Sequence, residues 1–456
     1  MFAGILLLSA LYLGNLTGMG LILPDEPRYA DIGRAMARTG DWVTPRLWGV
    51  PWFEKPALLY WMTGFGFRLG LGPETAPRLP VALLGLSFLL FFWLRLRKLW
   101  DATVASYATA ILATSAGWLA YSHVAVTDIP MAVLFSSALL LSIPEKEDGQ
   151  VNRTAIAALL ALATLAKSLP PLVLFFPVVA LDYRRLRLWL RPAPLAVFAL
   201  VTLPWHILCG VRNGSAFWRV LFVEHQFGRF TSTAMQHVQP FWYYLPVLLL
   251  LLYPWFPLLL CIPRKSGDLK DYRLRILVAV VGFGFLFLSA ARNKLPSYLL
   301  PLLPALCILI GLGVSRSRWR NAALVPCAAL LGLLPAAAGV LPAALSAGIR
   351  SAQIPFAALA LWLAAGLGIG AALTFAIRRK SLFAIAALTS LFFLWFQFAV
   401  FPGIDQAASG RPLWNAGHPA CAPPLRRTIL YSLYYYAGRE LPACGILDQS
   451  ALHVVR

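Results

Sequence analysis

Long hydrophobic stretches separated by short polar ones make up most of this chain. Thirteen can be delimited, at residues 2–23, 79–94, 102–122, 129–144, 154–166, 170–181, 192–211, 241–262, 276–291, 297–314, 321–345, 352–377 and 381–401. A helix needs about 20 mainly apolar residues to cross a bilayer. The pattern therefore predicts an all-α polytopic membrane protein with about 13 transmembrane helices, the first run being a span and not a signal peptide.

Two of these runs, 154–166 and 170–181, are short for a crossing, because a 13-residue helix rises only about 20 Å. The loops on both sides of the pair are basic, which requires two crossings between them. We expect the turn from Lys167 to Pro170 to lie within the outer leaflet, facing a cavity.

Composition agrees with this class of protein. Apolar residues make up 60% of the chain and charged residues 12%, against roughly a quarter charged in soluble proteins. The formal charge of +21 could indicate a nucleic acid partner, but in a membrane chain it favours anionic lipid headgroups or phosphorylated substrates.

Basic residues occur in every second loop, which predicts the side of the membrane for each segment. Placing these loops in the cytoplasm puts the N-terminus inside and the C-terminus outside. The long segments 24–78, 212–240 and 402–456 then share the outer face. We expect a transmembrane domain over 1–401, with 24–78 and 212–240 as outer loops, followed by a short outer segment over 402–456.

None of the thirteen runs contains Asp, Glu, Lys or Arg. Transporters usually carry ionisable groups inside the membrane, so this absence disfavours a transporter. The charged residues that could perform chemistry lie in the outer segments.

An acidic pair, Asp25 and Glu26, directly follows the first run. Residues 27–38 then predict an amphipathic helix lying on the membrane, with Tyr29 on its apolar side. Asp25 could simply cap that helix and Glu26 complement its dipole. The pair also suits a general base or a substrate or cation site at the boundary between water and lipid.

Three further outer motifs carry charge. Glu54 and Lys55 lie between aromatic residues, which suits either a membrane anchor or a contact to a phosphate and a cation. Asp128 opens the fourth run, as a helix cap or as a second acidic group. Glu224 and His225 lie in the 212–240 loop, where His225 and Glu54 could together bind a divalent metal, Zn or Mg.

Cations recur along the outer side. They are Arg28, Lys55, Lys167, Arg229, Arg292 and Lys294, with Tyr298 entering the next run. Cations near headgroups are common, but several that converge on one cavity would hold a lipid phosphate. The sequence contains no phosphate-binding P-loop and no dinucleotide fingerprint. Acids, cations and aromatics at a membrane surface favour group transfer from a lipid-phosphate donor.

Three motifs in combination, Asp25-Glu26-Pro27-Arg28-Tyr29, Trp52-Phe53-Glu54-Lys55-Pro56 and Thr127-Asp128-Ile129-Pro130, resemble membrane glycosyltransferases of the GT-C fold. Within that group the chain is most similar to bacterial aminoarabinose transferases, which modify lipid A, and to protein mannosyltransferases. The resemblance implies a sugar donor linked to a polyprenyl monophosphate such as undecaprenyl phosphate, an inverting transfer, an active site on the periplasmic face of the inner membrane, and no nucleic acid partner.

The resemblance also implies roles for single residues. Asp25 and Asp128 match catalytic acidic positions, Lys55 and Arg229 match contacts to the donor phosphate, and Tyr298 lines the same cavity. Together with Arg28, Lys167 and Lys294 these cations form the expected phosphate site. Glu54 and His225 match positions that hold zinc in a relative, although no cofactor is firmly required.

Cys421 and Cys444 lie together in the outer segment and are the one plausible disulfide pair, which an oxidising periplasm would permit. Two other functions stay open. One is a protein O-mannosyltransferase; the other, from a different class, is a flippase for a lipid-linked sugar.

Overall fold

The computed structural model describes residues 2–146, 149–227, 238–262, 270–347, 356–377 and 381–444. Within these ranges the chain is helical apart from one short antiparallel hairpin, β1 (Arg46–Leu47) and β2 (Val50–Pro51). The helices form one bundle with a continuous apolar core that contains Trp118 and Trp255. The predicted all-α class is confirmed.

The α-helices are α1 (Phe2–Leu13), α2 (Asp25–Thr39), α3 (Leu58–Arg68), α4 (Thr75–Leu99), α5 (Ala102–Ala113), α6 (Ala116–Ser122), α7 (Asp128–Ser142), α8 (Arg153–Lys167), α9 (Pro170–Leu181), α10 (Leu186–Trp189), α11 (Pro192–Asn213), α12 (Ser215–Trp218), α14 (Tyr244–Leu251), α15 (Tyr272–Ala290), α16 (Leu303–Arg316), α17 (Arg320–Leu330), α18 (Leu334–Ala347), α19 (Phe356–Ile377), α20 (Ser381–Ala408), α21 (Arg411–Gly417) and α22 (Arg427–Ala437). The other helical turns are η1 (Tyr183–Arg185), η2 (Arg219–Phe227), η3 (Phe241–Tyr243), η4 (Phe256–Cys261), η6 (Pro296–Leu302) and η7 (Leu331–Leu333).

Seven helical segments in the described ranges are long and apolar enough to cross a membrane, and five shorter apolar helices accompany them. The chain is therefore a multi-pass membrane protein. The figure of thirteen crossings stays a prediction, because several predicted runs are not single helices.

The runs 102–122 and 241–262 are each broken, which the hydrophobic pattern did not indicate. The backbone N–H of Ala116, at the start of α6, donates to the carbonyl of Tyr253 at 2.9 Å. Trp255 Nε1 donates to Thr114 Oγ1 at 2.8 Å. The two breaks thus satisfy each other's backbone and side-chain polar groups inside the bundle, as buried polar groups require.

The turn predicted between the two short runs is present. Helix α8 ends at Lys167 and α9 begins at Pro170, with Ser168 in the left-handed region at φ 62°. Lys167 is buried by neighbouring helices. The turn therefore holds a cation inside the protein.

Helix α2 has its predicted apolar side, but that side packs on protein rather than on a membrane. Tyr29, Ile32 and Met36 are all buried, and α2 lies against α3. Gly33 makes this close approach possible, because a Cβ there would lie 2.5 Å from Thr63 of α3. The prediction of a helix lying on the membrane through this face is wrong for that reason.

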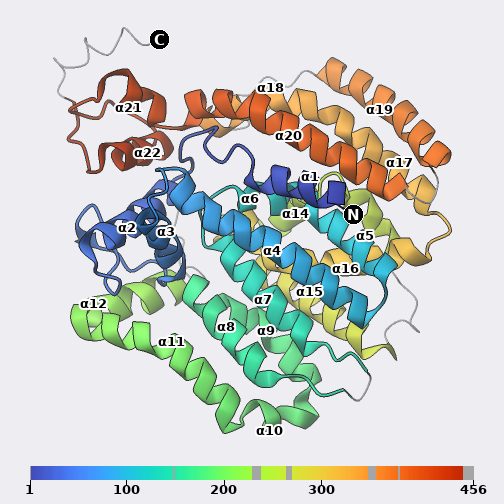
Figure 1. Cartoon of the computed structure of the whole chain (residues 1–456), viewed down its shortest axis with the longest axis horizontal. Helices are drawn as coiled ribbons and strands as arrows, with labels where there is room; N and C mark the ends of the chain where they lie inside the picture. Colours follow the sequence, from blue (N-terminus) through green and yellow to red (C-terminus); the bar gives the residue numbers. More distant parts are fainter. Residues whose placement is uncertain are drawn as a thin grey trace.

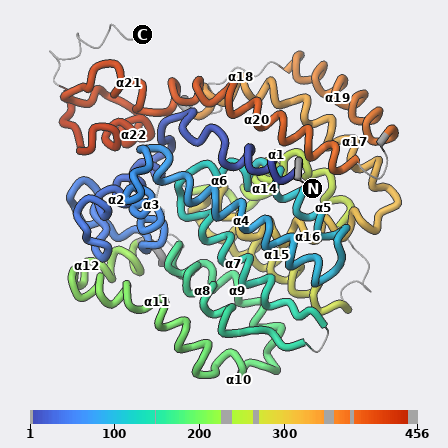
Figure 2. The backbone as a smooth tube through the Cα atoms, in the orientation of Figure 1, coloured from blue at the N-terminus to red at the C-terminus, as the bar shows by residue number. Residues whose placement is uncertain are grey.

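The predicted outer segments gather at one end of the bundle. In Figure 1, α2 and α3 lie beside α22 there, with α12 below them and α21 above. Figure 2 shows the chain running from α1 to this end, which we call the α2 end. At the opposite end, a cavity of about 580 Å³ is lined by Trp100, Arg273 and Arg316, so three of the basic loops meet there.

Candidate active site

Asp25 begins α2 and faces an arginine one turn later. Nη2 of Arg28 donates to the Asp25 carboxylate, and Nε of Arg28 donates to the Pro24 carbonyl at 2.9 Å. Nη1 of Arg28 lies 3.6 Å from Oε2 of Glu54. The loop after β2 thus brings Glu54 to the start of α2, and the three charged groups form the Asp25–Arg28–Glu54 cluster.

The alternative role of Asp25 as a helix cap is not what the structure shows. The N-cap residue of α2 is Pro24, and no side chain caps the helix there. Asp25 lies one position inside α2, where its carboxylate is 37% exposed and pairs with Arg28. It is therefore a partly accessible carboxylate held by a buried cation.

Aromatic rings surround the cluster. Cζ of Arg28 lies 5.2 Å from the ring centroid of Trp52 and 5.4 Å from that of Tyr431. The rings of Tyr29 and Tyr60 meet at 5.7 Å between centroids. Burial raises the pKa of both phenols well above their ordinary value, and the Asp25 and Glu54 carboxylates raise it further. Both phenols are therefore neutral hydrogen-bonding groups at physiological pH.

Three buried donors beside this cluster have no hydrogen-bond partner in the part of the chain that the structure describes. They are Nη1 of Arg28, Nε1 of Trp52 and Oη of Tyr60. Buried polar groups are normally paired. Three donors that make no hydrogen bond within the described ranges are therefore suited to hold the oxygen atoms of a polar ligand.

Asp128 and Lys167 form a second ion pair. Nζ of Lys167 donates to Asp128, and both side chains are about nine-tenths buried. The same Nζ lies 4.5 Å from the ring centroid of Tyr298 in η6. Asp128 does not cap α7, whose N-cap residue is Thr127. The structure thus brings together three residues that the sequence predicted for one site.

Glu26 requires a correction. Its carboxylate is completely buried and accepts two hydrogen bonds from Arg78, at 2.7 and 2.8 Å. It also accepts from the backbone N–H groups of Ile22 and Ala125. Because both oxygens are occupied inside the protein, Glu26 cannot meet a substrate or metal as predicted. We call this arrangement the Glu26–Arg78 node.

The node also places the two ion pairs relative to each other. The Ala125 N–H bonded to Glu26 belongs to the loop 123–127, and Asp128 follows that loop directly. Glu26 itself is the neighbour of Asp25. The acidic starts of α2 and α7 therefore lie at the same end of the bundle.

A cavity of about 770 Å³ opens between α6, α14, α18 and α20, with an almost wholly apolar lining. Its wall includes Leu23, two residues before Asp25, and Tyr121, which lies close to Asp128. Neither ion pair lines the cavity, but Leu23 and Tyr121 place one part of its wall near them. Its volume and apolar lining fit a hydrocarbon chain.

Two predicted phosphate contacts are buried lysines. Lys55 follows Glu54 and is 6% exposed. Lys294 donates to the carbonyls of Gln239 and Ala291, and burial lowers its pKa. Lys294 thus ties the turn after α15 to the end of the 212–240 segment, so part of its role is structural.

Arg229 and the side chain of His225 lie outside the described residues, so their predicted contacts stay predictions. Glu224 in η2 is exposed and pairs with Arg219 at 3.3 Å. Among the described residues, no group of three His, Cys, Asp or Glu side chains could hold a metal ion. The metal expected at Glu54 and His225 stays a prediction.

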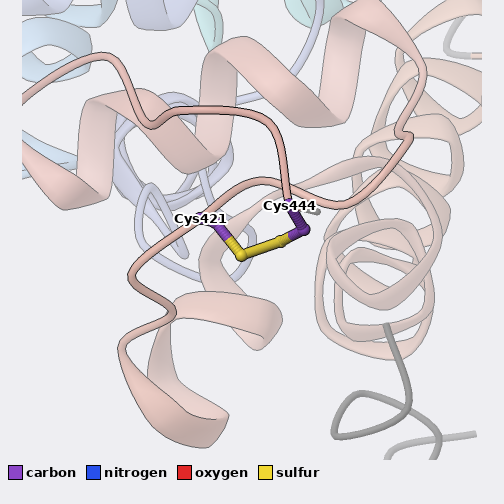
Figure 3. The surroundings of a disulfide bond; sticks show 2 residues. All are labelled: Cys421 and Cys444. Atoms are coloured by element: carbon purple, nitrogen blue, oxygen red, sulfur yellow. A yellow bond between two sulfur atoms is a disulfide. The ribbon is translucent and has the colours of Figure 1, made fainter. Parts of the chain in front are cut away.

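The segment after α20 folds back onto the α2 end. Cys421 and Cys444 form the predicted disulfide, with 4.9 Å between Cα atoms (Figure 3). This bond encloses α22, whose Ser432 donates to the Leu21 carbonyl at 2.6 Å. The segment is therefore part of the wall of the site.

The sequence analysis did not identify Arg78, Tyr60 or Tyr431. Arg78 immediately precedes the run 79–94, and its position carries no local sign of burial. Tyr431 is one of four tyrosines in the tail, at 431 and 434–436. Their helical spacing predicts an aromatic face, and that signal could have drawn attention to it.

Comparison with known proteins points the same way as this geometry. Residues 54–207 match the family of dolichyl-phosphate-mannose-protein mannosyltransferases. The chain superposes with a TM-score of 0.73 on the crystal structure of ArnT from Cupriavidus metallidurans bound to undecaprenyl phosphate, at 25% identity. The match covers 98% of this chain and 86% of that one. The chain has the GT-C fold.

Curated relatives agree with this GT-C assignment. The undecaprenyl phosphate-alpha-4-amino-4-deoxy-L-arabinose arabinosyl transferase of Edwardsiella ictaluri is 33% identical over 351 residues, which is 72% of this chain and 62% of that protein. The protein of the same name from Pseudomonas aeruginosa (strain LESB58) is 33% identical over 314 residues, 66% of this chain and 57% of that protein. The predicted resemblance to membrane glycosyltransferases is confirmed, and the chain spans about three fifths of the length of these relatives.

Proposed function

We propose that this GT-C protein is an inverting glycosyltransferase, which moves an aminoarabinose-like pentose or a hexose from a polyprenyl monophosphate to lipid A or another envelope glycolipid. The observation that carries the proposal is that Asp25–Arg28–Glu54 and Asp128–Lys167 lie at one end of the bundle, where the apolar cavity has Leu23 and Tyr121 in its wall. A lipid-linked sugar phosphate has a charged head and a hydrocarbon chain, so its binding site needs charged groups close to an apolar cavity. The names of the relatives and the undecaprenyl phosphate bound in the similar crystal structure support the same donor.

The proposed reaction is a single displacement. An acceptor oxygen forms a bond to the anomeric carbon of the sugar while the bond from that carbon to the phosphate oxygen breaks. The electron pair leaves with the polyprenyl phosphate. Where the acceptor is a hydroxyl, Asp25 takes its proton; where it is an ionised phosphate, no proton is removed and Asp25 orients the acceptor.

Cations at the α2 end would stabilise the charge that grows on the leaving phosphate. Lys167 and Lys55 are the described candidates, and Tyr298 lies under the Lys167 ammonium group. Arg28 serves mainly to hold Asp25 and Glu54, because two of its nitrogen atoms already bond Pro24 and Asp25. Lys294 and Arg229 are further proposed phosphate contacts.

The proposed location is the bacterial inner membrane, with the α2 end on the periplasmic side. The disulfide at that end suits an oxidising compartment. The basic loops at the opposite end suit the cytoplasm, and the N-terminus would lie there too.

A reconstitution assay tests the proposal. Purified protein is mixed with undecaprenyl-phosphate-linked aminoarabinose and lipid A, and mass spectrometry follows both lipids. We expect lipid A to gain the mass of the sugar while free undecaprenyl phosphate appears. Intact donor after long incubation with folded wild-type protein, for this sugar and for hexose-linked donors, would refute the transferase.

The match to the mannosyltransferase family favours a second candidate, in which the acceptor is a serine or threonine hydroxyl of a protein. The same donors with a peptide acceptor distinguish the two. Movement of the donor across vesicles without cleavage would instead indicate a flippase.

A further inference from the structure

Tyr431, on the C-terminal helix α22, lies against the cation of the proposed site. Its ring centroid is 5.4 Å from Cζ of Arg28, and the Trp52 ring lies 5.2 Å from the same atom. We propose that Tyr431 is a positioning residue, which holds Arg28 so that Arg28 can hold Asp25 and Glu54. This inference rests on the proposed function and deepens it, because it gives one side chain of α22 a part in transfer.

Few polar bonds hold Arg28 in place. Its side chain is 5% exposed, yet Nη1 lacks a hydrogen-bond partner within the described ranges and lies 3.6 Å from Glu54. Nε and Nη2 bond Pro24 and Asp25, both of which belong to the start of the same helix. Besides the ion pair with Glu54, the two aromatic rings are the contacts in the described residues that fix the guanidinium relative to the rest of the site. A desolvated guanidinium is attracted to such rings.

Tyr431 is itself held firmly, as a positioning residue must be. Its ring packs on Trp48 at 5.6 Å between centroids, and Cζ of Arg427 lies 5.1 Å from the centroid of the Tyr431 ring. Trp48 occupies the hairpin turn with φ at 49°, a left-handed conformation that costs energy for a residue with a side chain. The surrounding contacts evidently outweigh that cost.

The part of α22 that follows Tyr431 is anchored to the first outer loop. Oη of Tyr435 donates to the Pro73 carbonyl at 2.7 Å, and Oη of Tyr436 donates to Glu74 at 2.9 Å. The Cys421–Cys444 disulfide joins the two ends of the stretch that carries the helix. Loss of the Tyr431 ring should therefore leave α22 in place and release only Arg28.

Loss of the Tyr431 ring should affect transfer only through the position of Arg28. Without the ring, the guanidinium can turn away from Asp25, and the carboxylate loses the partner that orients it toward the acceptor. The donor phosphate contacts, Lys55 and Lys167, are untouched by this change. We therefore expect the turnover number to fall while the KM for the donor stays the same.

The test compares Tyr431→Leu, Tyr431→Phe and the control Trp414→Leu. Trp414 is an aromatic residue of the same segment whose ring packs on His418 at 4.5 Å. For Tyr431→Leu we expect kcat to fall about tenfold, the factor that about 1.4 kcal/mol produces and a size typical of a desolvated cation–π contact. Tyr431→Phe keeps the ring and should stay within about twofold of wild type, as should Trp414→Leu.

Three results would overturn the inference while leaving the transferase intact. They are wild-type kcat in Tyr431→Leu, an equal loss in Trp414→Leu, or a raised donor KM with unchanged kcat. Inactive wild-type protein would overturn the proposed function and this inference with it. A thermal-unfolding cycle of Arg28→Met, Tyr431→Leu and the double variant tests the contact without any activity: additive shifts in Tm would show that the two side chains do not interact.

Discussion

Asp25 and Glu26 are adjacent in the chain, yet the fold gives them opposite environments. Glu26 is completely buried, and its carboxylate bonds Arg78 and two backbone N–H groups. The Asp25 carboxylate is 37% exposed and belongs to the Asp25–Arg28–Glu54 cluster, at which three buried donors have no hydrogen-bond partner among the described residues. The Glu26 carboxylate finds all its hydrogen-bond partners inside the protein. The Asp25 carboxylate instead lies near donors that could bind a ligand.

We therefore assign the Glu26–Arg78 node to the stability of the fold and the Asp25–Arg28–Glu54 cluster to the reaction. Arg78 also donates to the carbonyls of Leu16, Met19 and Gly20, so the node fastens the link between α1 and α2 onto α4. The cluster one residue away depends on that fastening for its geometry. We expect changes in the node to unfold the protein, and changes in the cluster to stop the reaction in a folded protein.

The largest effect is expected for Asp25→Asn, which keeps the shape of the side chain and removes its charge. Loss of a general base typically slows a reaction by about 10²- to 10⁴-fold, and we expect transfer to a hydroxyl acceptor to fall within that range. The measurement is the release of undecaprenyl phosphate by purified protein. The Tm should change little, because Asp25 is partly exposed; wild-type turnover would refute the role of Asp25.

Arg78→Met should have the largest effect on stability. Removing one partner of a buried ion pair typically costs about 3–5 kcal/mol, because the other charge is left uncompensated. Thermal unfolding in detergent measures this loss. The double variant Glu26→Gln and Arg78→Met should recover part of it, since no buried charge then remains. If Arg78→Met unfolded like wild type but lost activity, the distinction between node and cluster would be wrong.

Much of this arrangement could be predicted from the sequence because each element carries a local signal. The apolar runs predict the membrane helices, and Lys167 to Pro170 predicts the turn between α8 and α9. The acidic and cationic motifs predict Asp25, Glu54, Asp128 and Lys167 at one end of the bundle, where the structure places them.

The remaining features depend on contacts between distant segments. Asp25 and Glu26 have the same local signal, and only the approach of Arg78 and the Ala125 loop makes Glu26 internal. The apolar face of α2 predicts burial but not the partner, which is α3 rather than lipid. The contact of Tyr431 with Arg28 joins residues about 400 positions apart, so no local pattern could indicate it.

The Cys421–Cys444 disulfide should affect both stability and turnover, because it holds α22 against the Asp25–Arg28–Glu54 cluster. It spans 23 residues and encloses α22, and a bond closing a loop of that size stabilises a fold by about 3 kcal/mol in the chain-entropy model. In the variant with Cys421→Ser and Cys444→Ser we expect a lower Tm and a reduced kcat. Reductant should lower the Tm of wild type only; an equal shift in the variant would show that the disulfide is not responsible.

Lys167 tests the same distinction, because its pair with Asp128 is about nine-tenths buried, as in a structural ion pair, and yet its Nζ lies against the Tyr298 ring of the proposed site. A hydrogen bond to a charged group is worth about 1.5–3 kcal/mol, so Lys167→Met should weaken inhibition by undecaprenyl phosphate by roughly 10- to 100-fold. The matched control is Arg95→Met, which removes a cation that pairs with Glu145 near the opposite end of α4. Unchanged inhibition in that control, with a weakened constant in Lys167→Met, would place Lys167 with the site; equal constants in both variants would place the Asp128–Lys167 pair with the structural node instead.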